Sequence, residues 1–470
     1  MFRVFLTAFF VATISAAPLF GCQQTEDSQS FPPGDLIPRV VALQNPQQSY
    51  ALYVPTKYSR ERRWPIVYVF DPLARGPLVL AQFQHAAEVH GYIVAVSNNS
   101  RNGPWQPEFE AAEAMVRDTQ RRFTVDLKRI YFAGFSGGAR VASQLAQLCK
   151  CAAGVLLSGA GFSHGSSPSA ESKFPVFSAV GDADFNYSEL IPLQDALEKA
   201  AFPHWLRIFD GPHEWAPPIV IDEALAWFRI ESVKSQREPG DEVFIAAQLS
   251  AAQARASALE KSGQLLAAWR EEGQIATTFD SLVDTEVVRA KASELEKQKA
   301  LRDAIKREHS DFEEQDRLSS EVLAATTPPQ VSDASPSQNR GDAATLARDL
   351  PLRAEREKKP ERVLVFKRAL ASVFIGSLES GRDALDKKDF RRAGSYFACA
   401  TEANPESEWS FRNLAIARAS SGDRKGALEA LRSARKLSKD PSAFSDWLTQ
   451  EPAFVRLLST SEYRVLREPL

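Results

Sequence analysis

A serine surrounded by glycines lies within the segment RIYFAGFSGGARVA, residues 129–142. A serine that attacks a carbonyl carbon needs its hydroxyl exposed at the end of a strand, and a sharp strand-to-helix turn provides this exposure. Side chains two residues before and two residues after such a serine would clash, so glycine is favoured at both positions. Gly134 and Gly138 occupy these positions around Ser136, between the apolar run RIYFA and the helix-forming run ARVASQLAQLC. The pattern therefore predicts that Ser136 is a nucleophile.

The residues around this turn predict a layered domain of strands and helices. From about residue 50 to residue 230, apolar β-rich runs alternate with helical stretches; these runs are YALYV, PIVYVF, YIVAVS, RIYFAGF, AGVLLSG, PVFSAV and HWLRIF. The four runs from PIVYVF to AGVLLSG lack polar alternation, which is typical of strands covered by helices on both faces. The sequence therefore predicts an α/β domain over residues 40–235, with a mostly parallel sheet.

With these features, the domain resembles the α/β-hydrolase family, and within it the compact esterases related to polyhydroxybutyrate depolymerases, feruloyl esterases and dienelactone hydrolases. The resemblance covers about residues 40–230 and implies a carboxylic ester hydrolase whose serine, acid and histidine follow in that order. The acid is then expected after the strand FPVFSAV, where GDADFNY offers Asp182 and Asp184. In similar hydrolases the acid commonly stands three residues after a glycine, which favours Asp184 and leaves Asp182 as the alternative.

The same resemblance implies a histidine after the last strand. His213 stands there in FDGPHEWAPP, and similar esterases carry a glycine before it and an aromatic residue two positions after it, here Gly211 and Trp215. In these roles His213 takes the proton of Ser136, and the acid orients the imidazole. A loop histidine without a catalytic role is the alternative. The other histidines lie on helices, at the wrong end of a strand or out of this order: His85, His90, His164, His204 and His309.

An oxyanion formed at Ser136 needs two hydrogen-bond donors. The N–H of Gly137 is expected to supply one, and the loop DPLARG at residues 71–76 the other. Pro72 cannot donate, so Leu73 is the predicted second donor, although the family often has His-Gly here and this chain does not. A further loop, residues 97–110, follows a strand at the end where such sheets bind ligands. Its Trp105 is expected either to wall the substrate pocket or to cover the core.

Composition excludes several classes of function. The formal net charge is -3, which argues against a nucleic-acid binder. The sequence contains neither a metal-ligand cluster nor a dinucleotide fingerprint, so no cofactor and no metal are expected. The four cysteines form neither a disulfide framework nor a zinc pattern. Cys149 and Cys151 are too close in sequence for easy bridging, and we interpret both as buried small apolar residues.

The first residues predict export. Residues 1–22, MFRVFLTAFFVATISAAPLFGC, combine one early cation with an apolar run, as in a signal peptide. The end of this run resembles a bacterial lipobox, in which Cys22 would be lipidated, although Phe20 departs from the residues usual there. Residues 23–39 are interpreted as a polar tether to a membrane, in the periplasm or at the cell surface. Secretion without a lipid anchor is the alternative.

The remainder of the chain predicts helices. Residues 241–325 have a helical composition and resemble a degenerate tetratricopeptide repeat, residues 326–350 have the composition of a linker, and residues 360–470 are expected to form an all-α helical-repeat domain. Two units of the last block resemble tetratricopeptide repeats, because Ala393, Phe397 and Ala400 recur 34 residues later as Ala427, Leu431 and Ala434. The alternative is a generic helical bundle with chance spacing.

Two functions follow from these features. The first is an exported, lipid-anchored serine hydrolase that acts on a small or extended ester, with the repeats binding a protein partner. The second is a surface-anchored interaction protein whose hydrolase-like domain is only a scaffold, since a fold alone does not guarantee chemistry. A serine-reactive fluorophosphonate probe distinguishes them.

Overall fold

The computed structural model describes residues 31–163, 166–169, 173–326, 343–458 and 460–467. The predicted export signal with Cys22, residues 23–30 of the tether, His164 and residues 327–342 of the predicted linker lie outside the described residues. The first strand, β1 (Leu36–Ala42), begins inside the segment interpreted as a tether. None of the helices in the described part of the chain is both long enough and apolar enough to span a bilayer.

The first half of the described chain is built on one eight-stranded sheet. Its strand order is β1-β2-β4-β3-β5-β6-β7-β8; β1 pairs antiparallel with β2 and β2 with β4, and the other pairs are parallel. Every residue of the three strands β3, β4 and β6 is buried, as expected for strands covered on both faces. The predicted fold class is confirmed. The further strands and their bounds are β2 (Asn45–Tyr53), β3 (Trp64–Phe70), β4 (Ile93–Ser97), β5 (Val125–Phe135), β6 (Ala152–Ser158), β7 (Val176–Gly181) and β8 (His204–Phe209).

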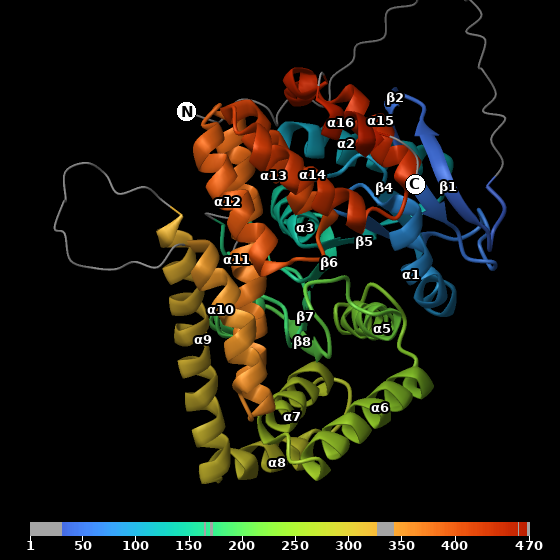
Figure 1. Ribbon diagram of the computed structural model, residues 1–470. Coiled ribbons are helices and arrows are strands. Elements are labelled where there is room, and N and C mark those ends of the chain that lie inside the picture. Colours follow the sequence, from blue (N-terminus) through green and yellow to red (C-terminus); the bar gives the residue numbers. More distant parts are fainter. Residues whose placement is uncertain (1–30, 164–165, 170–172, 327–342, 459, 468–470) are drawn as a thin grey trace, which may run out of the picture.

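Helices cover both faces of this sheet, and each face has its own core. Phe83 of α1 (Gly76–His90) and Trp227 of α5 (Pro218–Lys234) pack against the sheet on one face. Met115 of α2 (Trp105–Arg122) and Ala142 of α3 (Gly137–Cys149) pack on the other, together with Leu197 of α4 (Tyr187–Lys199). The strands lie between these two layers (Figure 1).

The second half of the described chain is helical, as predicted. Its α10 begins inside the segment expected to be a linker, because the apolar residues Ala347 and Leu350 are buried among the neighbouring helices. In Figure 1, α9 and α11 run side by side. The helices are α6 (Glu242–Lys261), α7 (Leu265–Phe279), α8 (Glu286–Lys297), α9 (Lys299–Ala325), α10 (Ala343–Arg356), α11 (Pro360–Asp386), α12 (Phe390–Ala403), α13 (Glu408–Ser421), α14 (Arg424–Leu437), α15 (Pro441–Gln450) and α16 (Ser461–Arg467), with a 3-10 turn η1 (Pro452–Leu457).

The helical region shares a core with the sheet domain. Ile245 of α6 and Phe279 of α7 belong to the same apolar cluster as Trp227 of α5. The side chain of Gln274, on α7, accepts a hydrogen bond from the backbone N–H of Leu206 on β8. Because β8 is an edge strand, this contact covers part of an edge that would otherwise be open.

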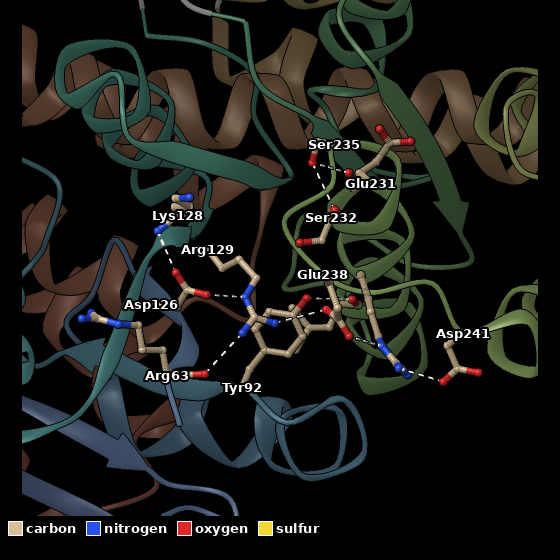
Figure 2. Close-up of polar contacts among 12 residues, drawn as sticks. Arg63, Tyr92, Asp126, Lys128, Arg129, Glu231, Ser232, Ser235, Glu238 and Asp241 are labelled. Atoms are coloured by element: carbon tan, nitrogen blue, oxygen red, sulfur yellow. Dashed lines mark hydrogen bonds and ion pairs between the residues drawn. The ribbon is translucent and has the colours of Figure 1, made fainter. Parts of the chain in front are cut away.

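A network of charged side chains fixes the connection between α5 and α6 (Figure 2). Arg129, on β5, donates to Asp126 at 2.8 Å and to Glu238 at 3.2 Å. Glu238 also accepts from Arg229 of α5 at 2.8 Å, and Arg229 donates to Asp241 at 2.9 Å. Asp241 is the N-cap of α6. The start of the helical region is therefore held near the amino end of β5, whereas Ser136 follows the carboxyl end of that strand.

The repeated residues of the last block lie where helices meet. The helices α12 and α14 begin at residues 390 and 424, 34 residues apart. The six small and apolar residues that recur at this period are all completely buried, and α12 packs against α11 and α13. They are Ala393, Phe397, Ala400, Ala427, Leu431 and Ala434.

The interpretation of Cys149 and Cys151 as buried apolar residues is wrong. The two sulfurs form a disulfide, and neither residue is buried. The helix α3 ends at Cys149, and Lys150 adopts a left-handed conformation with φ of 52°. This sharp reversal places the two Cα atoms 5.1 Å apart, within the range that a disulfide spans. Cys399 is buried and is not part of this disulfide.

Substituting Gly381 tests the close packing of α11 on α12. A Cβ at Gly381 would lie 2.6 Å from a ring carbon of Phe397, which is completely buried and has little room to move. We expect Gly381→Ala to lower the free energy of unfolding by about 1–3 kcal/mol, measured by chemical denaturation. Gly394→Ala, on α12, is the matched control, because a Cβ there meets no neighbour within 4 Å. A control as destabilised as Gly381→Ala would contradict this packing.

Candidate active site

Ser136 lies in a strained turn between β5 and α3. Its φ of 53° and ψ of -122° are rare for any residue except glycine, and such a conformation costs on the order of 1–3 kcal/mol. Three backbone hydrogen bonds hold it: the N–H of Ser136 donates to the carbonyl of Ser158 at 2.9 Å, and its carbonyl accepts from Ala139 at 3.0 Å and from Arg140 at 3.3 Å. The hydroxyl group therefore stands at the junction of strand and helix.

The two flanking glycines allow the backbone segments to approach each other. A Cβ at Gly134 would lie 2.0 Å from the carbonyl oxygen of Gly138. A Cβ at Gly138 would lie 2.1 Å from the carbonyl oxygen of Phe70, at the end of β3. Both contacts are with backbone atoms, which cannot rotate away, so neither position accommodates a side chain.

The structure brings Ser136, His213 and Asp184 together. The Nε2 atom of His213 lies 2.9 Å from Oγ of Ser136. Its Nδ1 atom lies 2.9 Å from each carboxylate oxygen of Asp184. Because Nδ1 faces a carboxylate, it carries the proton of the neutral ring, and Nε2 is left to accept the hydrogen bond of the serine hydroxyl. The three residues follow the carboxyl ends of β5, β7 and β8.

Aromatic rings enclose the imidazole of His213. The ring of Phe185 lies 4.3 Å from it and the ring of Phe135 lies 4.6 Å from it, centroid to centroid. Trp215 packs against Phe135 at 5.8 Å. The side chain of Asp184 is completely buried, whereas the side chain of His213 remains 16% exposed. A substrate can therefore reach the imidazole, while the carboxylate behind it is shielded from water.

Of the two carboxylates that the sequence left open, Asp184 contacts His213. Asp182 instead accepts a hydrogen bond from the backbone N–H of Gly211 at 3.2 Å. Asp182 thereby braces the loop that carries His213 without contacting the ring. The N–H of Asn186 donates to Asp184 at 2.8 Å, which adds a donor to the buried carboxylate.

The backbone N–H groups of Gly137 and Leu73 are placed differently. Gly137 is the first residue of α3, so its N–H has no carbonyl of the same helix to bond. The N–H of Leu73 donates to Oδ1 of Asp71 at 2.9 Å. In this structure it is directed at that carboxylate, contrary to the prediction that it is available as the second oxyanion donor. The reason is a local turn in which an aspartate side chain accepts from the residue two positions later.

Asp71 also ties the loop after β3 to the loop of His213. Its carboxylate is completely buried and accepts hydrogen bonds from Arg75 at 2.8 and 3.0 Å and from Nε1 of Trp215 at 2.8 Å. Burial alone would raise the pKa of Asp71, but the hydrogen bonds from Arg75, Trp215 and the Leu73 amide outweigh it, and the pKa lies below its usual value.

Asn102 is a residue of the site that the sequence reasoning missed. Its side-chain oxygen occupies the space that a Cβ of Gly137 would need, 1.8 Å from that position. The backbone N–H of Asn102 donates to the carbonyl of Pro72 at 2.9 Å, so the loop after β4 lies against the loop after β3. The signal was the polar loop at residues 97–110. Trp105, which the sequence placed in this loop, is the first residue of α2; it is 43% exposed and stacks on Phe109, so it is not part of the core.

The described residues include no cluster of three or more His, Cys, Asp or Glu side chains that could hold a metal ion. A cavity of about 310 Å³ is lined by Arg62, Trp64 and His90 among others, near the amino ends of β3 and β4. It lies at the amino ends of the parallel strands, whereas Ser136 follows the carboxyl end of β5.

Comparison with known proteins finds similarity at the level of the fold. No family model matches the chain, and no curated protein is similar to it in sequence. Three solved structures that resemble its sheet domain are an S-formylglutathione hydrolase from Staphylococcus aureus (15% identity, 38% of this chain and 90% of that chain, TM-score 0.33), a ferulic acid esterase (16%, 41% and 95%, 0.35) and an esterase from Pyrobaculum calidifontis (14%, 43% and 85%, 0.33). By name these neighbours are esterases and related hydrolases.

Replacing Asp71 tests the charge that links the two loops. Because the folded-state pKa of Asp71 is depressed, its charge stabilises the fold above the unfolded value of about 3.9, and this contribution is lost as the pH falls through the folded pKa. We expect Asp71→Asn to lower the free energy of unfolding at pH 7 by about 1–3 kcal/mol. Denaturation from pH 7 to pH 3 should show the difference between the two proteins shrinking toward acid. A difference independent of pH would contradict a role for the charge.

Proposed function

We propose that the chain is a serine hydrolase that cleaves carboxylic esters, with Ser136 as nucleophile, His213 as general base and Asp184 as the acid that orients it. One observation carries the proposal: the continuous hydrogen-bonded chain from Ser136 Oγ through both nitrogens of His213 to Asp184, with each distance 2.9 Å. The strained glycine turn adds support, since it holds the hydroxyl at the carboxyl end of the sheet.

The reaction follows from this geometry in two halves. As Oγ of Ser136 attacks the ester carbonyl, Nε2 of His213 takes its proton, and Asp184 stabilises the resulting imidazolium. Collapse of the tetrahedral intermediate expels the alcohol, which receives the proton from Nε2 and leaves the acyl group on Ser136. A water molecule, deprotonated by the same imidazole, then attacks the acyl-enzyme and releases the acid.

The oxyanion is assigned to two donors next to Ser136. The first is the N–H of Gly137, as in the sequence prediction. The second is the side-chain amide of Asn102, which lies against Gly137. A side-chain amide can rotate its NH₂ group toward the oxyanion, whereas the N–H of Leu73 would first have to leave Asp71.

The alternative, a scaffold whose hydrolase-like domain is inactive, has less support. A scaffold has no need for a strained serine turn, for a histidine bonded to both serine and carboxylate, or for a buried acid. Export, lipidation at Cys22 and binding of a protein partner by tetratricopeptide-like hairpins remain part of the proposal, on the sequence features and the buried 34-residue repeat. Comparing the rates at which short acyl, feruloyl and acetylated-sugar esters are hydrolysed would identify the acyl group that the site accepts.

Variants of the three proposed catalytic residues test the function directly. Ser136→Ala should abolish both hydrolysis of a chromogenic acyl ester and labelling by a fluorophosphonate probe. Asp184→Asn should lower kcat by about 10⁴, because the histidine loses the charge and the tautomer it needs. Asp182→Asn is the matched control, since asparagine can still accept from the N–H of Gly211, and its kcat should change little. Full activity in Ser136→Ala, or no probe labelling of the native protein, would refute the proposed function.

Asn102→Ala tests the second oxyanion donor. Loss of one such donor costs about 10²–10³ in kcat, so we expect a decrease of that size with KM nearly unchanged. Asn99→Ala is the control, because its side chain lies in the same loop but bonds to the backbone at Ser49 and Gln47. Unchanged kcat in Asn102→Ala would show that the second donor lies elsewhere, with the Leu73 amide as the next candidate.

A further inference from the structure

The short segment that carries Asp184, residues 182–186, is called the acid segment here. It is held by side chains from the helical region. Nη1 of Arg368, on α11, donates to the carbonyl of Asp182 at 2.9 Å. Nε2 of Gln315, on α9, donates to the carbonyl of Phe185 at 2.8 Å. These carbonyls lie on either side of Asp184, so two helices far away in the sequence bracket the acid from both directions.

Both donors are buried at the interface between the two regions. Arg368 is 5% exposed and Gln315 is 1% exposed. The guanidinium of Arg368 lies 4.6 Å from the ring centroid of Tyr187, directly after the acid segment. Among the described residues no carboxylate forms an ion pair with Arg368, which bonds to the carbonyl of Asp182, and its Nε has no hydrogen-bond partner. The carboxylates of Asp311 and Glu308 act on Arg368 only from beyond ion-pair distance. A buried cation without a directly bonded carboxylate is costly for stability, so an apolar side chain would serve better if packing were its only task.

Further contacts keep α9 and α11 against this segment. Phe312 of α9 belongs to an apolar cluster with Tyr187 and with Val180 of β7. The hydroxyl of Tyr187 donates to Glu308 of α9 at 2.9 Å. Arg362 of α11 forms ion pairs with two carboxylates of α9, Asp311 and Glu314, and so fixes the two helices to each other.

We propose that the helical region completes the active site, and that Arg368 and Gln315 are positioning residues that act through Asp184. The inference rests on the proposed function. Phe185 makes the coupling direct, because its carbonyl is held by Gln315 while its ring lies 4.3 Å from the imidazole of His213. Releasing either carbonyl lets the acid segment move relative to Nδ1 of His213, and a displacement of about 1 Å can cost roughly 10²-fold in rate.

The test uses the full chain and steady-state hydrolysis of a chromogenic acyl ester. Arg368→Met and Gln315→Met keep side-chain volume and remove the donors. Each should lower kcat about 10- to 100-fold with little change in KM, and Arg368→Lys, which retains a donor, should recover part of the loss. Arg382→Ala is the matched control, because Arg382 lies on the same helix but contacts Trp409 instead. Its kcat should equal that of the native protein.

A double-mutant cycle separates positioning from general destabilisation. In the Asp184→Asn background, Arg368→Met and Gln315→Met should produce no further decrease in kcat, because the residue through which they act is already disabled. Gln315→Met provides the same cycle should Arg368→Met not fold. Native kcat in both Met variants, or an equal loss with and without Asp184, would overturn the inference. An inactive, unlabelled native protein would instead refute the proposed function, and the inference with it.

Discussion

The turn at Ser136 is the constraint on which the rest of the site depends. A positive φ at a residue with a side chain is unfavourable, and it persists only where surrounding contacts leave the backbone no alternative. Here β5 enters the turn between β3 and β6, and α3 leaves it with Gly138 against the carbonyl of Phe70. The buried sheet and the packed helix thus keep the backbone in its strained conformation, and the serine hydroxyl lies at the carboxyl ends of the parallel strands.

Loops that follow separate strands converge at these carboxyl ends because the strands are parallel. Asp184, His213 and Asn102 follow three other strands, and each loop is bonded to a neighbour. Asp71 joins the loop after β3 to Trp215, and Asp182 joins the loop after β7 to Gly211. These carboxylates contact neither Ser136 nor the imidazole, yet they fix the distance between the loops that do. The precision of the site is a property of this bonded set of loops.

The helical half of the chain packs directly against the sheet domain and bonds to the loops of the site. It shares an apolar core with α5, covers the edge strand β8 through Gln274, and bonds to both sides of the acid segment. A region that contributed only a binding surface would need none of these contacts. The described structure therefore joins the helical region and the sheet domain into one unit, and the coupling that we propose acts through the side-chain-to-backbone hydrogen bonds of Arg368 and Gln315.

The sequence alone determined the features that depend on neighbouring residues. The Gly-x-Ser-x-Gly turn, the alternation of buried strands with helices and the 34-residue helical period are local patterns with direct backbone consequences. Tertiary structure decided what depends on distance between remote segments: the contact of His213 with Asp184 and not Asp182, the occupation of the Leu73 amide by Asp71, and the place of Asn102. The disulfide at Cys149 was also missed, because it depends on the left-handed backbone at the end of α3. Composition specifies which groups are present, whereas only packing specifies which of them meet.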